Sequence, residues 1–142
     1  MLTSSMEEHA QGPLQEELES ILPTEFAARI KRLGIVNAMD DENFAAAVKA
    51  TGRKKLIIAG VTNDVCTVYP ARSLVCDGFE VQVVADAGGS PSKMADDIAL
   101  RRMERGGVTL TSTNQLMAEL AGSLATPEGG QPVQVLMESF QA

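Results

Sequence analysis

Short apolar runs alternate with amphipathic segments along the second half of the chain. The run at residues 56–59 is continuous and rich in branched side chains, which is typical of a strand covered on both faces. Apolar positions at helical spacing separate it from later runs. The predicted order is strand 55–60, helix 64–77, strand 80–86, helix 92–105, strand 108–111 and helix 113–120. Strands that alternate with helices predict an α/β fold with a mostly parallel sheet and right-handed crossovers.

The first half of the chain has a less regular pattern. Proline at a helix start and apolar residues on one face predict a helix over residues 13–22, which Pro23 is expected to stop. The other predictions are the end of a strand at residues 1–5, a polar loop at 7–12, a short strand at 26–30, irregular chain at 34–40 and a helix at 43–51.

The length of 142 residues suits one domain with a core, predicted here over residues 1–122, followed by an arm or tail at 123–142. The net charge is −7 and no basic stripe is present, so nucleic acid and anionic membranes are not expected partners. Cys66 and Cys76 are ten positions apart in one predicted helix, about 15 Å, which is too far for a disulfide. A reducing, cytoplasmic location is therefore predicted.

Cys66 is the residue most suited to chemistry. It is predicted to lie in the first helical turn after the strand at residues 55–60, at the edge where open α/β sheets bind ligands. The positive end of a helix favours the thiolate, which is the nucleophilic form. The alternative from position alone is a buried structural cysteine. No metal site is expected, because His9 is the single histidine and lies far from Cys66 in the sequence.

Several segments together resemble the isochorismatase-like cysteine hydrolases, and within them the YcaC-like branch. The similarity runs from about residue 2 to about residue 120. Its segments are Gly60-Val61-Thr62-Asn63-Asp64-Val65-Cys66, Pro70-Ala71, Asp77-Gly78-Phe79, Val83-Val84-Ala85-Asp86-Ala87, Gly106-Gly107, Gln11-Gly12-Pro13-Leu14 and Arg32-Leu33-Gly34-Ile35-Val36-Asn37-Ala38. The resemblance implies a Rossmann-like three-layer α/β/α fold with a mostly parallel sheet, and a small amide or related carbonyl compound as substrate.

The resemblance also implies a triad of aspartate, lysine or arginine, and cysteine. By this resemblance Cys66 is the nucleophile that attacks a carbonyl carbon, and Arg32 is the basic member that holds the thiolate and the acid. The acid serves as the general base for the thiol and later for a water molecule. No cofactor is implied.

The segment before Cys66 carries further implied roles. A cis peptide is expected between Val61 and Thr62, and the N–H groups of Thr62 and Cys66 are expected to form the oxyanion hole. Asn37 and Asn63 are expected to contact the substrate.

One departure from the family pattern is large. The chain begins in what resembles the second strand of the fold, so the expected fold is truncated at its amino terminus and the catalytic aspartate has no counterpart. Asp40, Asp64 and Asp86 do not occupy its place in the pattern. Three explanations remain open: a truncated product, a unit supplied by another chain, or a catalytically impaired homologue with a binding or assembly role. A homo-oligomer is expected, because the absent strand leaves apolar surface uncovered and the relatives are oligomers.

Overall fold

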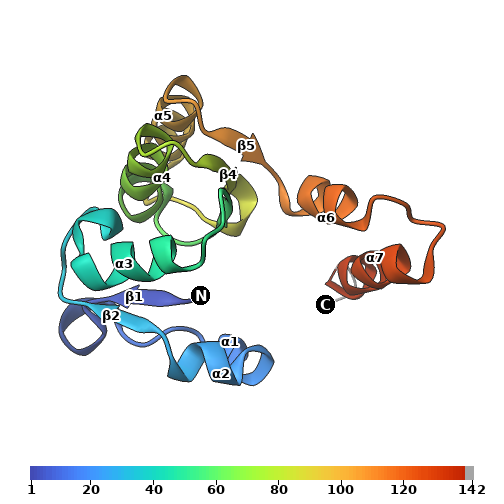
Figure 1. The fold of residues 1–142 in the computed structure, drawn as a ribbon, viewed down its shortest axis with the longest axis horizontal. Helices are drawn as coiled ribbons and strands as arrows, with labels where there is room; N and C mark the ends of the chain where they lie inside the picture. The colour runs from blue at the N-terminus through green and yellow to red at the C-terminus, as the bar shows by residue number, and fades with distance from the viewer. Residues whose placement is uncertain (140–142) are drawn as a thin grey trace. The chain divides into compact units, whose positions relative to one another are not determined.

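The computed structural model describes residues 1–139 and divides the chain into two compact units, residues 1–54 and 55–142. Figure 1 colours the first unit blue to turquoise and the second green to red. Each unit has its own parallel sheet, so the predicted α/β class is confirmed. Within the described residues, no helix is long and apolar enough to cross a membrane.

The first unit is built on two short parallel strands, β1 (Thr3–Ser5) and β2 (Ile30–Arg32), in which Ser4 is the partner of Lys31. Its helical segments are η1 (Glu7–Gln11), α1 (Glu16–Ile21), α2 (Pro23–Ala27), η2 (Ala38–Asp40) and α3 (Glu42–Ala50). The helix α3 begins where it was predicted, because the Asp41 side chain accepts a hydrogen bond from the Phe44 N–H and caps it.

Two predictions for the first unit are wrong. Residues 7–11 form a π-helical turn rather than a loop, since three successive N–H groups donate to the Met6 carbonyl. The helix before Pro23 ends at Ile21, as predicted, but Pro23 itself begins a second helix, α2, in place of the strand predicted at residues 26–30, because its fixed φ and missing N–H suit the first helical position. Phe26 consequently lies in a helix, where it is buried, and the strand starts only at Ile30.

The second unit contains a three-stranded parallel sheet of order β3-β4-β5. Its strands are β3 (Lys55–Ile58), β4 (Glu80–Val84) and β5 (Thr109–Thr111). Its helical segments are η3 (Asn63–Thr67), α4 (Val68–Cys76), η4 (Ala85–Ala87), α5 (Lys93–Arg105), α6 (Thr113–Ala121) and α7 (Pro127–Ser139). Ser92 caps α5 and Ser112 caps α6, so the predicted starts of both helices are confirmed.

The core of the second unit gathers around the central strand β4. Val81, Val83 and Val84 are buried, as are Leu74 of α4 and Met103 of α5. Val83 and Met103 are fully enclosed, so β4 and the two helices share one apolar interior.

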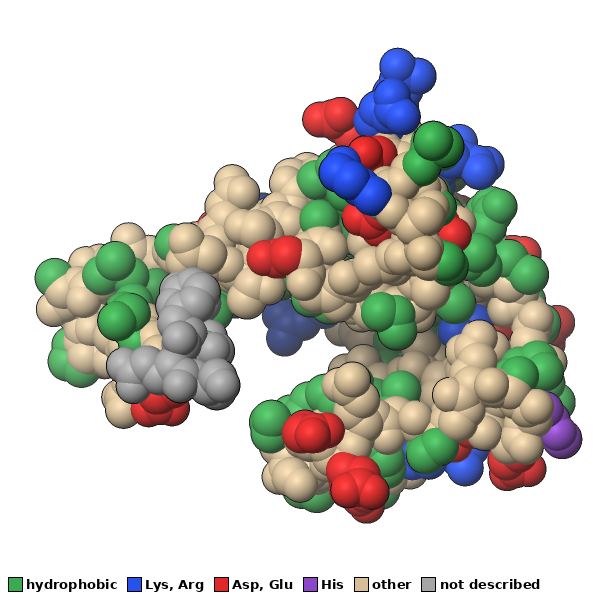
Figure 2. Space-filling view, turned by 180° about the vertical axis from the view of Figure 1, so that it is seen from behind, with side chains coloured by type: hydrophobic (Ala, Val, Ile, Leu, Met, Phe, Trp, Pro, Cys, Tyr) green, Lys and Arg blue, Asp and Glu red, His purple; other side chains and the backbone are tan. Residues whose placement is uncertain are grey.

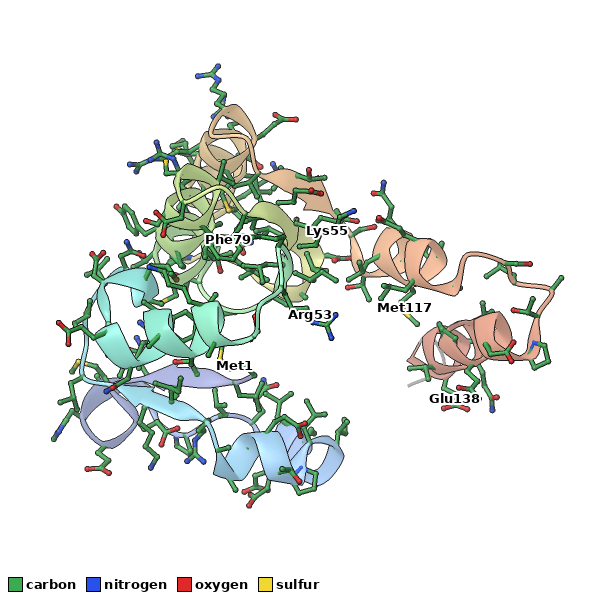
Figure 3. All side chains as sticks on the ribbon, viewed as in Figure 1. Met1, Arg53, Lys55, Phe79, Met117 and Glu138 are labelled. Carbon is green, nitrogen blue, oxygen red and sulfur yellow. The ribbon has the colours of Figure 1, made fainter. Side chains whose placement is uncertain are left out.

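The predicted burial of β3 on both faces is wrong in this structure. Ile57 is 51% exposed, and Lys55 at the start of the strand (labelled in Figure 3) extends to an exposed ion pair with Glu80. Among the strands described for residues 55–139, β3 pairs with β4 alone and forms an edge. An edge strand has neighbours on one side only, so its side chains are covered less than those of a central strand.

The predicted arm or tail at residues 123–142 contains a helix, α7, which contacts α6. The compact units divide between residues 54 and 55, and a domain boundary at residue 122 stays a prediction. Residues 140–142 of the predicted tail lie outside the described part of the chain.

Candidate active site around Cys66

The turn that carries Cys66 follows the carboxyl end of β3. The peptide bond between Val61 and Thr62 is cis, at the position that the family resemblance implies. Residues Asn63–Thr67 then form the π-helical turn η3, which leads directly into α4. Cys66 lies in this π-helical turn, just before the helix expected to contain it, and its side chain is partly exposed.

Asn63 holds this turn in place from inside the protein. Its N–H donates to the Gly89 carbonyl at 2.8 Å. Its fully buried side-chain amide donates to the Ala85 carbonyl at 3.2 Å and to Asp96 Oδ1 at 3.0 Å. The buried amide therefore holds the backbone of the turn, and the expected contact of Asn63 with the substrate stays a prediction.

Ser90 and Asp96, which the sequence analysis did not identify, also hold the Cys66 turn in place. The Ser90 hydroxyl donates to Asp96 Oδ1 at 2.8 Å and accepts from the Asp64 N–H at 3.2 Å. Asp96 thereby joins the first turns of α5 to the loop after β4 and to the Cys66 turn. The only sequence signal was an acidic residue in the first turn of a predicted helix, which does not reveal a distant partner.

Close approach of the backbone also fixes the turn. A Cβ atom at Gly88 would overlap Asn63 Oδ1 and the Gly60 carbonyl oxygen, whereas one at Gly89 would meet nothing within 4 Å. Gly88 therefore lets the loop after β4 pack directly against the turn that carries Cys66.

The residue after Cys66 ties the turn to the end of β3. Thr67 is buried, its N–H donates to the Thr62 carbonyl at 3.0 Å, and its hydroxyl donates to the Gly60 carbonyl at 3.2 Å. The N–H groups of Thr62 and Cys66 are the donors expected for an oxyanion hole, and that role stays a prediction.

Arg32 belongs to the first unit, at the end of β2. Its side chain is buried, with Nε donating to Thr3 Oγ1 and Nη1 donating to the Ile35 carbonyl, each at 3.1 Å. The guanidinium lies 6.0 Å from the centre of the Phe44 ring. In the part of the chain that the structure describes, Arg32 forms no ion pair with a carboxylate.

Asn37 lies in the same unit as Arg32 and caps a 3₁₀ turn. Its Oδ1 accepts from the Met39 N–H and its Nδ2 donates to Asp40 Oδ1, both at 3.1 Å. The structure fixes the first and second units separately, so the expected approach of Arg32 and Asn37 to Cys66 stays a prediction.

The carboxylates of the second unit have different surroundings. Asp86 accepts from the N–H and the hydroxyl of Thr113, at 2.7 and 2.9 Å, and so ties η4 to the start of α6. Asp64 Oδ1 is buried without a hydrogen-bond partner among the described residues. No group of three His, Cys, Asp or Glu side chains in that part of the chain could hold a metal ion.

Residues 11–115 match the model of the isochorismatase domain. The chain belongs to the isochorismatase family. A match over this stretch includes the Cys66 turn and the segment with Arg32, which are two of the segments on which the resemblance is based.

The YcaC-like branch is also established. The chain is 42% identical over 120 residues to the probable hydrolase YcaC of Escherichia coli, covering 84% of this chain and 57% of that protein. The chain thus spans little more than half the length of this curated relative. Both units contribute residues to the stretch that matches the domain model.

Two solved structures confirm the isochorismatase-like fold. YcaC from Pseudomonas aeruginosa, solved with hexane-2,5-diol and covalent acrylamide, has a TM-score of 0.86 at 38% identity and covers all of this chain and 74% of that one. The E. coli YcaC gene product, described as an octameric hydrolase of unknown specificity, has a TM-score of 0.78 at 37% identity over 99% of this chain and 72% of that one.

Proposed function

We propose that the chain carries the nucleophilic part of a cysteine hydrolase site that acts on a small amide or related carbonyl compound. The observation that carries the proposal is the turn at residues 60–67. It presents a partly exposed thiol after the cis peptide between Val61 and Thr62, and buried hydrogen bonds hold it in place. Family membership adds a hydrolase relative with the same fold.

The chemistry follows from what these groups can do. The Cys66 thiolate forms a bond to the carbonyl carbon, and the carbonyl electron pair moves to the oxygen. The N–H groups of Thr62 and Cys66 donate to this oxyanion. Collapse of the tetrahedral species breaks the bond to the leaving amine, which takes a proton and departs. Water then attacks the thioester, and the acid product and the free thiol are released.

The preorganised turn supplies the largest part of the stabilisation in this proposal. Removing one oxyanion donor typically costs about 10²–10³-fold in rate, since a fixed dipole needs no reorganisation when charge develops. Asn63 serves this step as a positioning residue, because it fixes the backbone that carries both donors. Asn37 is the residue proposed to contact the substrate.

Arg32 is the basic member in this proposal. A buried guanidinium needs an anionic partner, because its remaining donors are otherwise desolvated without compensation. The catalytic thiolate and the family's carboxylate are partners of the required charge. The absence of a carboxylate within ion-pair distance among the described residues supports such a role.

Hydrolysis of the thioester needs a general base, and whether the chain has one decides between turnover and a binding or assembly role. General acid–base assistance is worth about 10²–10⁴-fold, and the family's acid has no counterpart in the sequence pattern of this chain. We therefore propose that the 142-residue chain is acylated at Cys66 but hydrolyses the thioester slowly. A homologue that binds ligand or assembles without turnover is the alternative, because the family's aspartate has no counterpart in this sequence.

Intact-mass spectrometry during reaction with p-nitrophenyl acetate tests the proposal. The expected result is one acetyl adduct that maps to Cys66, persists for many minutes, and is absent from the Cys66→Ser variant. An adduct that also forms on Cys66→Ser would overturn the nucleophile. Fast multiple turnovers without an adduct would show that another residue, such as Asp64 or Asp86, acts as the base.

We also propose that the protein forms a homo-oligomer. E. coli YcaC is octameric, and this chain leaves several large apolar side chains exposed in the second unit, including Ile57, Leu120 and Val135. Multi-angle light scattering at micromolar concentration should give at least a dimer. A well-folded monomer would contradict this proposal.

A further inference from the structure

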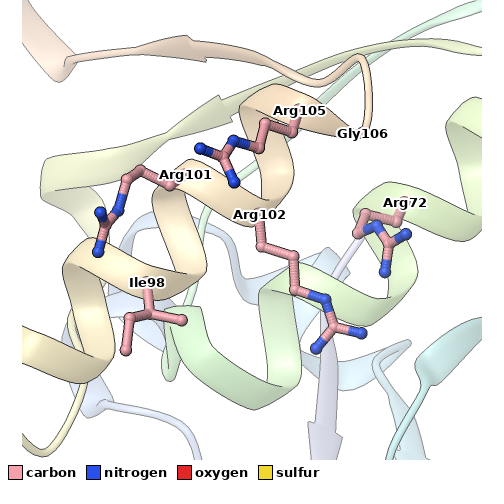
Figure 4. Close-up of a pocket in the computed structure, with 6 residues that line it drawn as sticks. All are labelled: Arg72, Ile98, Arg101, Arg102, Arg105 and Gly106. Atoms are coloured by element: carbon pink, nitrogen blue, oxygen red, sulfur yellow. The ribbon is translucent and has the colours of Figure 1, made fainter.

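A cavity of about 430 Å³ lies between α4 and α5, within the second unit. Four of the six residues that line it are arginines, as Figure 4 shows: Arg72, Ile98, Arg101, Arg102, Arg105 and Gly106. Three of these arginines come from the last turns of α5, and Arg72 comes from α4. The cavity is independent of the chemistry proposed for Cys66.

This concentration of positive charge is unusual for the composition of the chain. The net charge is −7. The chain has seven arginines, of which four line this cavity: Arg29, Arg32, Arg53, Arg72, Arg101, Arg102 and Arg105. Figure 2 shows blue side chains gathered at the top of the molecule, beside some red ones. Nevertheless, none of the four forms an ion pair with a carboxylate of the described residues.

The arrangement carries a cost that an anion would remove. Arg101 and Arg105 are four positions apart on one helix face, where like charges destabilise the helix. Attraction to the negative carboxyl end of α5 explains cations in the last turn. It does not explain why Arg72 of a different helix joins them.

Arg72 is the feature that a charged end of α5 alone does not explain. Its Nε atom is buried and has no hydrogen-bond partner among the described residues. A Cβ atom at Gly106 would lie 3.1 Å from this Nε and 3.2 Å from Arg72 Cγ, so the glycine leaves the space that the arginine occupies. A donor buried without a partner in the protein is suited to a partner supplied by a ligand.

We propose that this arginine cavity binds a phosphate-bearing small molecule. Guanidinium groups present fixed pairs of N–H donors that match phosphate oxygens, and several of them together balance more than one negative charge. The volume falls in the range of small-molecule sites and exceeds that needed for one phosphoryl group.

A second cavity indicates how such a ligand would be oriented. It has a volume of about 240 Å³, shares Ile98 and Arg102 with the arginine cavity, and reaches Asp64. A carboxylate disfavours an anion, so the phosphate belongs at the Arg72 end. The uncharged part of the ligand would then lie along Ile98, toward Asp64.

Isothermal titration calorimetry tests this proposal with the full chain at fixed ionic strength, with sodium pyrophosphate, adenosine monophosphate and sodium citrate as probes. We expect saturable binding of one pyrophosphate per chain, weakened by added salt, with citrate weaker. Binding of adenosine monophosphate at least as tight as that of pyrophosphate would indicate a ligand with an organic part.

Variants locate the binding. The double variant R101Q/R105Q should weaken pyrophosphate binding at least tenfold, because two charge-assisted contacts are lost. Both side chains are exposed, so the fold should persist, which circular dichroism checks. R53Q removes an exposed arginine that does not line the cavity and should leave the affinity unchanged.

Three results would overturn the proposal. The first is no saturable pyrophosphate binding by the unmodified chain. The second is equal weakening in R53Q and in the double variant, which would mean unspecific attraction. The third is a change in oligomeric state of the double variant with unchanged pyrophosphate affinity, which would make the cavity a contact between copies of the chain.

Discussion

The Cys66 turn and the Arg32 side chain differ in how completely their own unit supports them. The turn at residues 60–67 is held by buried hydrogen bonds from Asn63 and Thr67 and by the loop after β4, all within the second unit. Arg32 is also buried, but in the first unit it meets one hydroxyl, one carbonyl and an aromatic ring, without a carboxylate.

This difference separates two requirements of a cysteine hydrolase. The geometry that presents the thiol, and with it the proposed oxyanion donors, is a property of the local backbone, and the hydrogen bonds that hold it lie within the second unit. The electrostatic requirement needs an acid as partner of the cation, and no residue described in the first unit supplies it. Acylation should therefore depend on the turn, whereas turnover should depend on an acid.

The largest effect is expected from Cys66→Ser, which should abolish acylation and thiol alkylation at this position. A serine hydroxyl at neutral pH is far less nucleophilic than a thiolate. The matched control is Cys76→Ser, which removes an exposed thiol from the end of α4 and should leave acylation unchanged. Acyl-adduct formation in both variants is measured by intact mass. Equal loss in the two variants would contradict the assignment.

The next largest effect is a difference in stability between alanine substitutions at two adjacent glycines. Gly88→Ala should lower the free energy of unfolding by about 3 kcal/mol, because its Cβ would overlap Asn63 Oδ1 and the Gly60 carbonyl. Gly89→Ala has open space and should change stability by less than about 0.5 kcal/mol. Urea unfolding of both variants makes the comparison, and equal stabilities would show that the close approach does not fix the turn.

Asn63→Ala should cost about 2 kcal/mol, since it removes the buried amide that donates to Asp96 and to the Ala85 carbonyl. It should also slow alkylation of Cys66, because the turn loses its internal anchor. Ser92→Ala removes a helix cap of the same α5 and should cost about 1 kcal/mol without changing alkylation. If alkylation slows equally in both variants, the effect reflects stability and not the anchor.

The smallest effect concerns the first unit and pH. Arg29, with Ser4 and Lys31, holds the pKa of Glu7 at about 2, below its usual 4.5. A depressed carboxyl pKa contributes stability above the usual pKa, and this contribution is lost as pH falls from about 4.5 toward 2. Glu7→Gln should reduce stability at pH 7 and flatten the pH dependence in that window. Glu8→Gln, which alters an exposed carboxyl outside the ion pairs of Glu7, should do neither. Thermal unfolding from pH 7 to pH 2 measures both.

Local signals in the sequence were sufficient for part of the fold and of the site. Cap residues such as Ser92 and Ser112 satisfy nearby N–H groups, so the starts of α5 and α6 were predictable. The apolar run of β4 and the position of Cys66 just after β3 were predictable for the same reason: each depends on a few neighbouring residues.

Features that depend on distant partners were not predictable. The runs that form β3 and β4 are both apolar, yet Ile57 is exposed and Val83 is buried, because one strand is at the edge and the other is central. Asp96 contacts Asn63 from 33 positions away. The arginine cavity likewise joins Arg72 to α5 residues that the sequence pattern does not connect with it.

Iodoacetamide labelling at neutral pH, followed by peptide mapping, tests the central claim most directly. Cys76 is exposed and Cys66 only partly so, which means that access alone would favour Cys76. A nucleophilic Cys66 in its folded turn predicts the opposite order: Cys66 labels faster, and the two rates converge in denaturant. Labelling of Cys76 as fast as Cys66 in the folded chain at neutral pH would contradict the account.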